Sequence, residues 1–397
     1  MRVSLSICGN ATIYATGARP DLKAGGLNFS DRREPPRRED GIMDVYGMAE
    51  FDAHEAIHIF HKKSLGLRFI VAIHNTTRGP AVGGCRMWNY PSFGDALGDA
   101  LRLSRGMTYK AALADLPYGG GKSVLMGDAS LKSPAVLAAV GEAVESLAGQ
   151  FTISDDLGVS LADVSVIGAS TRFACAPMLP DGTTIPATAF GVFHGIRATA
   201  VHVFGTDDIG RRSVAVQGLG AVGNKLCEYL AEAGATLFVA DLDPERVTAA
   251  VRRWNARPMA VEEILFAAVD ILAPCALGGI LNAGTIGRLR CRAIAGAANN
   301  QLATPENGVA LAARGITYAP DFVINAGGLI EVAHLRSGVF ETDNVLEDCR
   351  RIFDRALNVL ECAAASGEDP NSVAERFARE RLPAKPPAVK IALDASP

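Results

Sequence analysis

The sequence predicts an α/β fold of two domains around a cleft, the second of them built on a doubly wound parallel sheet. Three observations lead to this fold class. The chain has 397 residues, enough for two or three domains of roughly 150 residues each. Short β-branched runs alternate with segments of helical length, which is typical of parallel sheets covered by helices on both faces. A glycine-rich run joins two of the strand-like segments, at the place where such folds bind nucleotides.

The composition excludes several classes of protein. Hydrophobic residues make up 49% and charged residues 21%, and no uninterrupted apolar run approaches the ~18 residues of a membrane helix. A net charge of −4 provides no positive field that would attract nucleic acid. The 8 cysteines are spread without any C-x-x-C pair, which suits a reducing compartment. We therefore expect a cytoplasmic protein that binds neither membranes nor nucleic acid.

The two ends of the chain differ in composition from the middle. Residues 1–42 end in a charged, proline-broken run that cannot bury enough apolar surface to become ordered. The last residues are linker-like and rich in proline. We predict a disordered extension over 1–42, a first domain over 43–184, a second domain over 185–343, C-terminal helices over 344–382 that pack back on the first domain, and a tail over 383–397.

Individual elements follow from local patterns. Residues 67–74 form a short β-branched run between turn-forming segments and predict a buried strand. Ser92 has the position of a helix N-cap, because apolar residues recur after it at helical spacing as far as Ser104. A second helix is predicted over 131–147. In the second domain, strands are predicted over 213–217, 236–240, 270–274 and 292–296.

A dinucleotide fingerprint, G-x-G-x-x-G, directly follows the strand over 213–217. Gly218 allows a tight turn, Gly220 lets the backbone approach a pyrophosphate, and Gly223 allows the helix to pack closely on the strand. Ala221 and Val222 lie at the start of that helix, whose free N–H groups face the phosphates. The motif and its flanking strands predict that the second domain is Rossmann-type.

An acidic residue, Asp241, ends the next strand, 23 residues after Gly218. A carboxylate at this place accepts hydrogen bonds from ribose hydroxyls, and its charge repels a 2′-phosphate. The expected cofactor is therefore NAD rather than NADP, although Arg246 nearby weakens this preference.

Two lysines, Lys110 and Lys122, stand among small and apolar residues, unlike the lysines of a solvated face. A lysine in such surroundings can pair with a substrate carboxylate, or desolvation can make it a general base. The three glycines before Lys122 would let a substrate approach the backbone there. The alternative is that both side chains reach out to water, and residue type alone favours this alternative.

A family resemblance changes that balance. The chain resembles the glutamate/leucine/phenylalanine/valine family of amino-acid dehydrogenases, closest to the leucine dehydrogenase type, from about Met43 to about Glu361. The matching motifs are Gly79-Pro-Ala-Val-Gly-Gly-Cys-Arg86, Arg105-Gly-Met-Thr-Tyr-Lys110, Gly119-Gly-Gly-Lys122, Asp155-Asp-Leu-Gly158, Ala187-Thr-Ala-Phe-Gly191, Ala273-Pro-Cys-Ala-Leu-Gly278, Gly296-Ala-Ala-Asn-Asn-Gln301 and Pro320-Asp-Phe-Val-Ile-Asn-Ala-Gly-Gly328.

The resemblance implies roles for residues in these motifs. Lys110 would bind the substrate α-carboxylate, Lys122 would be the catalytic base, and Asp156 would pass protons at the α-amino group. Asp156 is chosen over Asp155 by aligning Leu157-Gly158, because leucine-type members carry a glutamate at position 155. This chemistry is consistent with oxidative deamination, in which a hydride leaves Cα for the nicotinamide and an activated water then attacks that carbon. The remaining positions implied by the resemblance are Gly84 and Asn300 for substrate, and Thr188, Asn299 and Asn325 for cofactor.

The same resemblance bears on the substrate. Glutamate dehydrogenases carry a lysine where this chain has Val82, and a valine cannot neutralise a side-chain carboxylate. Ser154, Leu329 and Val332, the other expected pocket residues, add no positive charge. Leucine or valine is therefore the preferred substrate, and phenylalanine or tryptophan stays open because one methylene changes binding by only ~1–3 kcal/mol. The products would be a 2-oxo acid and ammonia, and the resemblance also implies a homo-oligomer.

Two other readings compete. The run His54-Glu-Ala-Ile-His58 spells the H-E-x-x-H pattern of zinc proteases, but no glutamate that could be a third ligand follows before position 142. We therefore predict no metal site there, and instead an amphipathic helix with exposed histidines. The second alternative is a catalytically silent NAD-binding relative. Against it, Lys110, Lys122 and Asp156 all stand in matching motifs.

Overall fold

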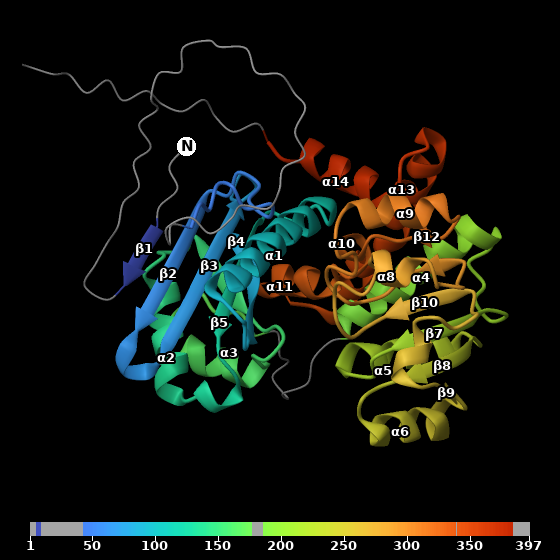
Figure 1. The fold of residues 1–397 in the computed structure, drawn as a ribbon, viewed down its shortest axis with the longest axis horizontal. Coiled ribbons are helices and arrows are strands. Elements are labelled where there is room, and N and C mark those ends of the chain that lie inside the picture. Colours follow the sequence, from blue (N-terminus) through green and yellow to red (C-terminus); the bar gives the residue numbers. More distant parts are fainter. Residues whose placement is uncertain (1–4, 9–42, 177–185, 339, 384–397) are drawn as a thin grey trace, which may run out of the picture.

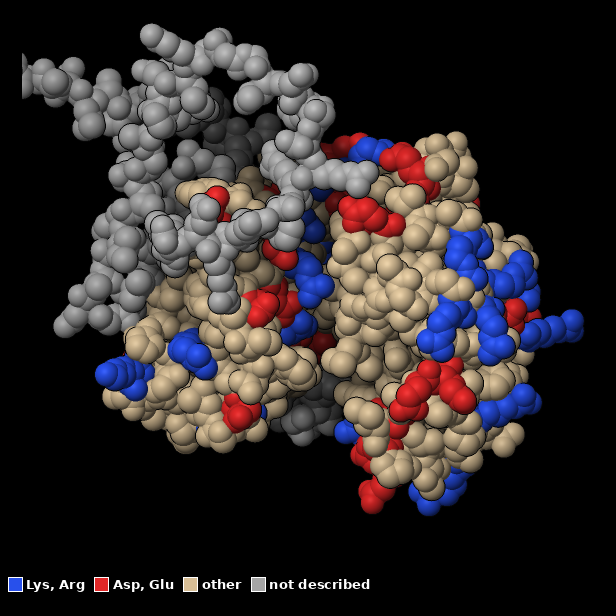
Figure 2. Space-filling model, viewed as in Figure 1, with Lys and Arg blue, Asp and Glu red and all other residues tan. Residues whose placement is uncertain are grey.

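The computed structural model describes residues 5–8, 43–176, 186–338 and 340–383, which form two α/β domains, each around one sheet (Figure 1). In the space-filling view of Figure 2, a furrow bordered by charged side chains separates the two lobes. Within the described ranges, no helix combines the length and the apolar character needed to cross a membrane.

The first domain contains a sheet of six strands in the order β1-β2-β3-β5-β4-β6. These strands are β1 (Leu5–Cys8), β2 (Ala56–Lys62), β3 (Leu67–Asn75), β4 (Ala81–Trp88), β5 (Gly119–Met126) and β6 (Phe151–Ser154). The strand predicted over 67–74 is confirmed as β3. It runs antiparallel to both β2 and β5, so this sheet is mixed rather than parallel.

Helices cover both faces of this sheet. Helix α1 (Phe93–Leu113) packs on one face, and α2 (Pro134–Glu145) and α3 (Leu161–Gly168) pack on the other. The predicted cap is confirmed, because Ser92 Oγ accepts a hydrogen bond from the amide of Asp95. Helix α2 starts three residues later than predicted, since Ser133 caps it and Ala129–Leu131 forms a separate 3-10 turn. Because α1 extends to Leu113, it carries Lys110 on its last turns.

The second domain is the predicted Rossmann-type sheet, with six parallel strands in the order β12-β11-β10-β7-β8-β9. Its strands are β7 (Ser213–Gln217), β8 (Thr236–Ala240), β9 (Arg257–Pro258), β10 (Ile271–Pro274), β11 (Ala293–Ile294) and β12 (Thr317–Tyr318). Its helices are α4 (Ala187–Phe204), α5 (Ala221–Glu232), α6 (Pro244–Trp254), α7 (Val261–Ile264), α8 (Ala283–Ile286), α9 (Glu306–Ala313), α10 (Asp321–Ile324) and α11 (Gly327–Ser337).

The C-terminal helices are α12 (Thr342–Arg350), α13 (Ile352–Ser366) and α14 (Pro370–Glu380). We predicted that helices from about residue 344 pack back on the first domain, but α12 and α13 pack on α4 of the second domain instead. Their buried faces belong to the same apolar core as α4. Helix α14 reaches the first domain, where Arg379 Nε donates to the Tyr109 hydroxyl on α1 over 3.0 Å.

The prediction of an amphipathic helix with exposed histidines was wrong. Ala56–Lys62 is strand β2, hydrogen-bonded along its whole length to β3, and not a helix. His54 is fully buried, and its Nε2 lies 3.0 Å from the carbonyl oxygen of Leu101 on α1. Sheet pairing therefore overrides the chance helical spacing of the two histidines. In the part of the chain that the structure describes, no cluster of three or more His, Cys, Asp or Glu side chains could hold a metal ion.

The prediction that residues 1–42 are disordered does not hold for residues 5–8, because these form β1, paired in parallel with β2. The rest of that segment, and the tail after residue 383, lie outside the described residues.

Candidate active site

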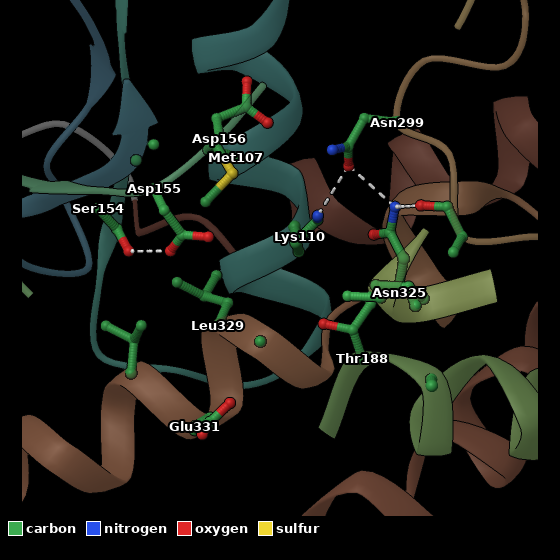
Figure 3. Close-up of a pocket in the computed structure, with 18 of the residues that line it drawn as sticks. Met107, Lys110, Ser154, Asp155, Asp156, Thr188, Asn299, Asn325, Leu329 and Glu331 are labelled. Carbon is green, nitrogen blue, oxygen red and sulfur yellow. Dashed lines mark hydrogen bonds between the residues drawn. The ribbon is translucent and has the colours of Figure 1, made fainter. Parts of the chain in front are cut away.

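A cavity of about 720 Å³ lies between the two domains and is lined by both of them. Figure 3 shows its lining from four directions: helix α1, the end of β6, the start of α4 and helix α11. It contains most of the predicted site residues, namely Val82, Gly84, Lys110, Lys122, Ser154, Asp156, Thr188, Ala221, Val222, Asn299, Asn325, Leu329 and Val332.

Glycines bring the elements of the first domain close enough to build this cavity. A Cβ on Gly120 of β5 would lie 2.1 Å from the backbone nitrogen of Thr108, so only glycine lets α1 pack this closely on the strand. A Cβ on Gly84 would lie 2.4 Å from the carbonyl oxygen of Asp155, so the loop after β6 depends on a glycine in the same way. These close approaches place Lys110, Lys122 and Asp156 around one space.

The Lys122 ammonium and the Asp156 carboxylate form an ion pair, with 2.8 Å between Nζ and Oδ2. Lys122 is only 4% exposed, and the same carboxylate oxygen accepts a second hydrogen bond from Arg86 Nε at 2.9 Å. Burial by itself would raise the pKa of Asp156. The positive charges of Lys122 and Arg86 outweigh it and hold that pKa well below its usual range. Asp156 is therefore ionised at neutral pH, next to a buried amine.

Lys110 joins the two domains. Its Nζ donates to Asn299 Oδ1 over 3.1 Å, and Asn325 Nδ2 donates to the same oxygen over 2.9 Å. Figure 3 shows Thr188 on the same side of the cavity, at the start of α4. Burial lowers the pKa of Lys110 to about 8, although Asp321 opposes this shift. A buried ammonium that donates to a neutral amide oxygen can exchange that partner for a substrate carboxylate.

An apolar subsite lies beside these polar groups. Val82, Leu329 and Val332 belong to one buried cluster with Ala111 and Cys175. Val82, Leu329 and Val332 are three of the positions that the sequence analysis expected around the substrate side chain, and the structure brings them together. Ser154 lies at the cavity wall, where its hydroxyl donates to Asp155 Oδ1 over 3.0 Å.

The fingerprint loop fits a dinucleotide. Gly218 has a φ of +95°, and a Cβ on Gly223 would lie 1.9 Å from the carbonyl oxygen of Gly218, so both positions require glycine. Gly220 is the N-cap of α5 and faces open space, since no atom lies within 4 Å of a Cβ built on it. Free N–H groups at the start of a helix next to open space suit a pyrophosphate.

Asp241 stands at the end of β8, outside the lining of the cavity. Its Oδ2 accepts from the amide of Leu219 over 2.6 Å, and its Oδ1 accepts from the amide of Asp243 over 2.8 Å. Arg246 lies 3.2 Å from Asp243 and 3.9 Å from Asp241, so these two carboxylates surround its guanidinium. The loop after β8 thus carries two carboxylates beside one guanidinium.

One predicted substrate residue lies elsewhere. Asn300 does not line this cavity but a smaller one of about 80 Å³, which Arg105, Tyr109 and α14 also line. Its φ of +52° turns the chain between Asn299 and Asn300, so the two neighbouring amides face different spaces. The structure therefore places Asn300 away from the residues with which we expected it to bind substrate, and Asn299 is the residue that meets Lys110.

Sequence reasoning also missed residues of the site. Arg86 had no expected role beyond ending one of the family motifs, but its side chain contacts Asp156. Glu331 lines the cavity and is 5% exposed, although every residue expected around the substrate side chain was uncharged. Met107 completes the lining from α1, three residues before Lys110. Helical spacing from Lys110 could have indicated Met107, whereas Glu331 carries no local signal.

Comparisons with known proteins agree with the site. Residues 56–172 match the model of the Glu/Leu/Phe/Val dehydrogenase dimerisation domain, and residues 238–335 match that of glutamate/leucine/phenylalanine/valine dehydrogenase. The leucine dehydrogenase of Thermoactinomyces intermedius is 41% identical over 344 residues, which cover 86% of this chain and 94% of the relative. The phenylalanine dehydrogenase of the same organism is 42% identical over 348 residues, with the same two shares of 86% and 94%.

Among solved structures, the L-tryptophan dehydrogenase of Nostoc punctiforme is similar with a TM-score of 0.70 and 42% identity, over 83% of this chain and 96% of that one. These matches span both domains and confirm the resemblance predicted from the motifs. The chain therefore belongs to the glutamate/leucine/phenylalanine/valine dehydrogenase family of oxidoreductases.

Proposed function

We propose that this protein catalyses the reversible, NAD-dependent oxidative deamination of an apolar L-amino acid to its 2-oxo acid and ammonia. One observation carries this proposal. A single cavity holds the Lys122–Asp156 ion pair, the ammonium of Lys110 and the apolar cluster of Val82, Leu329 and Val332. These are the groups needed for proton transfer, for a carboxylate and for an apolar side chain.

Binding begins at Lys110 and at the apolar subsite. The substrate carboxylate replaces Asn299 as the partner of the Lys110 ammonium, and the side chain enters the cluster of Val82, Leu329 and Val332. The substrate amino group then faces Lys122 and Asp156. Domain closure over the substrate would exclude water from the hydride step.

Proton transfer is assigned to the ion pair. NAD, when bound, would supply the hydride acceptor for Cα, so the proton transfers at the resulting imine are left to residues of this chain. Lys122 Nζ, after its ammonium has given up a proton by way of Asp156, takes a proton from the water that adds to Cα. Asp156 then passes this proton from Lys122 Nζ to the departing nitrogen, which leaves as ammonia, and Lys122 Nζ takes the hydroxyl proton of the water adduct as the carbonyl forms. Asp156 Oδ2 lies 2.8 Å from Lys122 Nζ, which is close enough for a proton to pass between the two groups.

NAD is favoured over NADP by the charge at the end of β8. Asp241 and Asp243 are both acidic, and Arg246 is held between them rather than free to meet a phosphate. The pyrophosphate would bind at the fingerprint loop, where Gly220 caps the start of α5.

The apolar subsite supports an aliphatic substrate such as leucine or valine. Phenylalanine and tryptophan are the alternatives, and the relatives described above are named for leucine, phenylalanine and tryptophan. We further propose that the protein works as a homo-oligomer, because residues 56–172 match a dimerisation domain. Light scattering should then give a multiple of the monomer mass.

The decisive test is NADH formation by the purified protein at mildly alkaline pH with leucine, valine, phenylalanine, tryptophan or glutamate, and with NADP in parallel. We expect turnover of at least one apolar amino acid with NAD, and none of glutamate. Binding of NAD without turnover of any of the five would favour the silent relative, and turnover of glutamate alone would overturn the assignment of the subsite.

A further inference from the structure

Arg86 of β4 lies behind the catalytic ion pair. Its Nε donates to Asp156 Oδ2 over 2.9 Å, and Lys122 Nζ lies 2.8 Å from the same oxygen. Its side chain is 17% exposed and is not part of the cavity lining. Any effect of Arg86 on the reaction must therefore pass through Asp156, because the guanidinium itself does not meet the substrate.

The other end of the guanidinium is also fixed. Arg86 Nη1 donates to Asp99 Oδ2 on α1 over 3.1 Å, and that carboxylate also accepts from the Tyr90 hydroxyl over 2.6 Å. Arg102 Nη2 donates to the second oxygen of Asp99 over 2.8 Å. Opposite charges thus alternate from Lys122 through Asp156, Arg86 and Asp99 to Arg102. A planar guanidinium held between two carboxylates has little freedom to rotate.

We propose that Arg86 is a positioning residue that fixes the Asp156 carboxylate against Lys122 and thereby sets the pH range of catalysis. This inference rests on the proposed function. Without the guanidinium, Asp156 keeps only Lys122 as a cationic partner within hydrogen-bond distance among the described residues. The carboxylate is then free to turn about its side-chain bonds, away from the reacting nitrogen.

Other charged and titratable groups surround the pair without bonding to Asp156. They are Cys85 on β4, Tyr90 after it, Lys110 and Asp99 on α1, and Asp155 beside Asp156. Burial raises the pKa of Cys85 to about 12, so its thiol stays neutral across the working range. Burial also keeps Tyr90 neutral by raising its pKa above the ordinary value. Lys110 is a cation in the same cavity, and its ammonium donates to Asn299 rather than to Asp156.

The experiment compares pH profiles of kcat and kcat/KM for wild type, Arg86→Gln and Arg86→Lys with the amino acid found in the panel above. The positive charge of Arg86 favours loss of a proton from the neighbouring Lys122–Asp156 pair. Removing this charge should therefore move the rising limb of the pH profile, where activity increases with pH, to higher pH by about one unit. We expect kcat to fall about 10- to 100-fold with KM changed less than about threefold, because Lys110 and the apolar subsite are untouched. Arg86→Lys, which keeps the charge, should partly restore both kcat and the pH of the rising limb.

Arg102→Gln is the matched control, because Arg102 bonds the same Asp99 but not Asp156. It should leave the limb where wild type has it. In an Asp156→Asn background, Arg86→Gln should cost nothing further, since the group through which it acts is gone. Equal thermal unfolding and NAD binding of the variants would show that they fold. An unshifted limb in Arg86→Gln, or the same loss in Arg102→Gln, would overturn the proposal.

A readout independent of activity separates this inference from the proposed function. Carboxyl ¹³C NMR of aspartate-labelled protein, with the Asp156 signal assigned by its loss in Asp156→Asn, follows that group directly. Arg86→Gln should raise the midpoint of its titration. A raised midpoint in a protein that turns over no amino acid would reject the function but keep the arginine contact, whereas an unmoved midpoint in an active enzyme would reject the role of Arg86 alone.

Discussion

The ammonium of Lys110, on helix α1 of the first domain, donates a hydrogen bond to the side-chain oxygen of Asn299 in the second domain over 3.1 Å. The contact crosses the cavity at the place where we expect a substrate carboxylate. It therefore connects substrate binding to the relative position of the two domains, because the carboxylate must replace Asn299 as the partner of Lys110.

Lys110 should make substrate binding depend on pH. Burial lowers its pKa to about 8, and only the protonated form can pair with a carboxylate. Inhibition by 4-methylpentanoate, which has no amino group that titrates, should weaken as the pH rises above about 8. Lys110→Gln should weaken inhibition by 4-methylpentanoate about 100-fold at pH 7, because removing one partner of a buried pair costs roughly 2–5 kcal/mol. The same variant should abolish the pH dependence of inhibition. A wild-type inhibition constant that stays flat to pH 10 would contradict this role.

Lys122→Ala should remove the base while leaving the nucleotide site intact. We expect kcat to fall about 1,000-fold, within the range of general-base contributions, and NAD binding measured by fluorescence to be unchanged. The fingerprint loop belongs to the other domain, which is why binding should survive. Undiminished turnover in this variant would refute the assignment.

Val82→Lys should turn the apolar subsite against its substrate. Val82 is buried in the cluster with Leu329, and an ammonium there lacks a partner unless the substrate brings a carboxylate. We expect kcat/KM for leucine to fall at least about 100-fold and turnover of glutamate to appear. Val82→Ala, which changes volume but not charge, is the control and should leave glutamate unused.

Asp241→Asn should weaken discrimination against NADP. The amide keeps an oxygen for the N–H of Leu219 but removes the negative charge at the end of β8. The ratio of kcat/KM for NADP to that for NAD should rise about 10-fold, equivalent to ~1.4 kcal/mol. Asp243→Asn removes the other charge next to Arg246 and keeps the cap of α6, so the two variants together show which carboxylate sets the preference.

His54 should make the protein less stable in mild acid. Desolvation lowers its pKa from 6.5 to about 4 in the folded state, so between these values the unfolded chain binds the proton more readily. The free energy of unfolding should therefore fall as the pH drops from about 6.5 to about 4, by up to roughly 3 kcal/mol from this residue. His54→Asn should flatten the dependence seen in urea titrations. His61→Asn, at an exposed position of β2, should not.

Much of the fold could be predicted because its signals are local. The Ser92 cap, the strand at 67–74 and the glycine spacing of the fingerprint each depend on residues within one turn or one strand. The predicted lysines and Asp156 also meet in one cavity. Their roles were implied by the family resemblance, whereas their residue types alone favoured surface lysines.

The errors concern contacts between distant segments. Whether residues 56–62 form a helix or a strand depends on β3, which pairs with them along the chain. Asn299 and Asn300 share a motif, and only the left-handed turn at Asn300 decides which of them faces Lys110. The sequence shows that the C-terminal helices have apolar faces, but it does not show that these faces pack on α4.

The sequence by itself determined the two-domain α/β plan, the nucleotide loop and the uncharged character of position 82, because backbone conformation and side-chain chemistry are properties of the residues themselves. Only the tertiary structure decided that Arg86 contacts Asp156, 70 residues further along the chain, and that Glu331 lines the cavity. Such pairs form only when separate strands and helices pack together, and their geometry depends on that packing rather than on any local pattern.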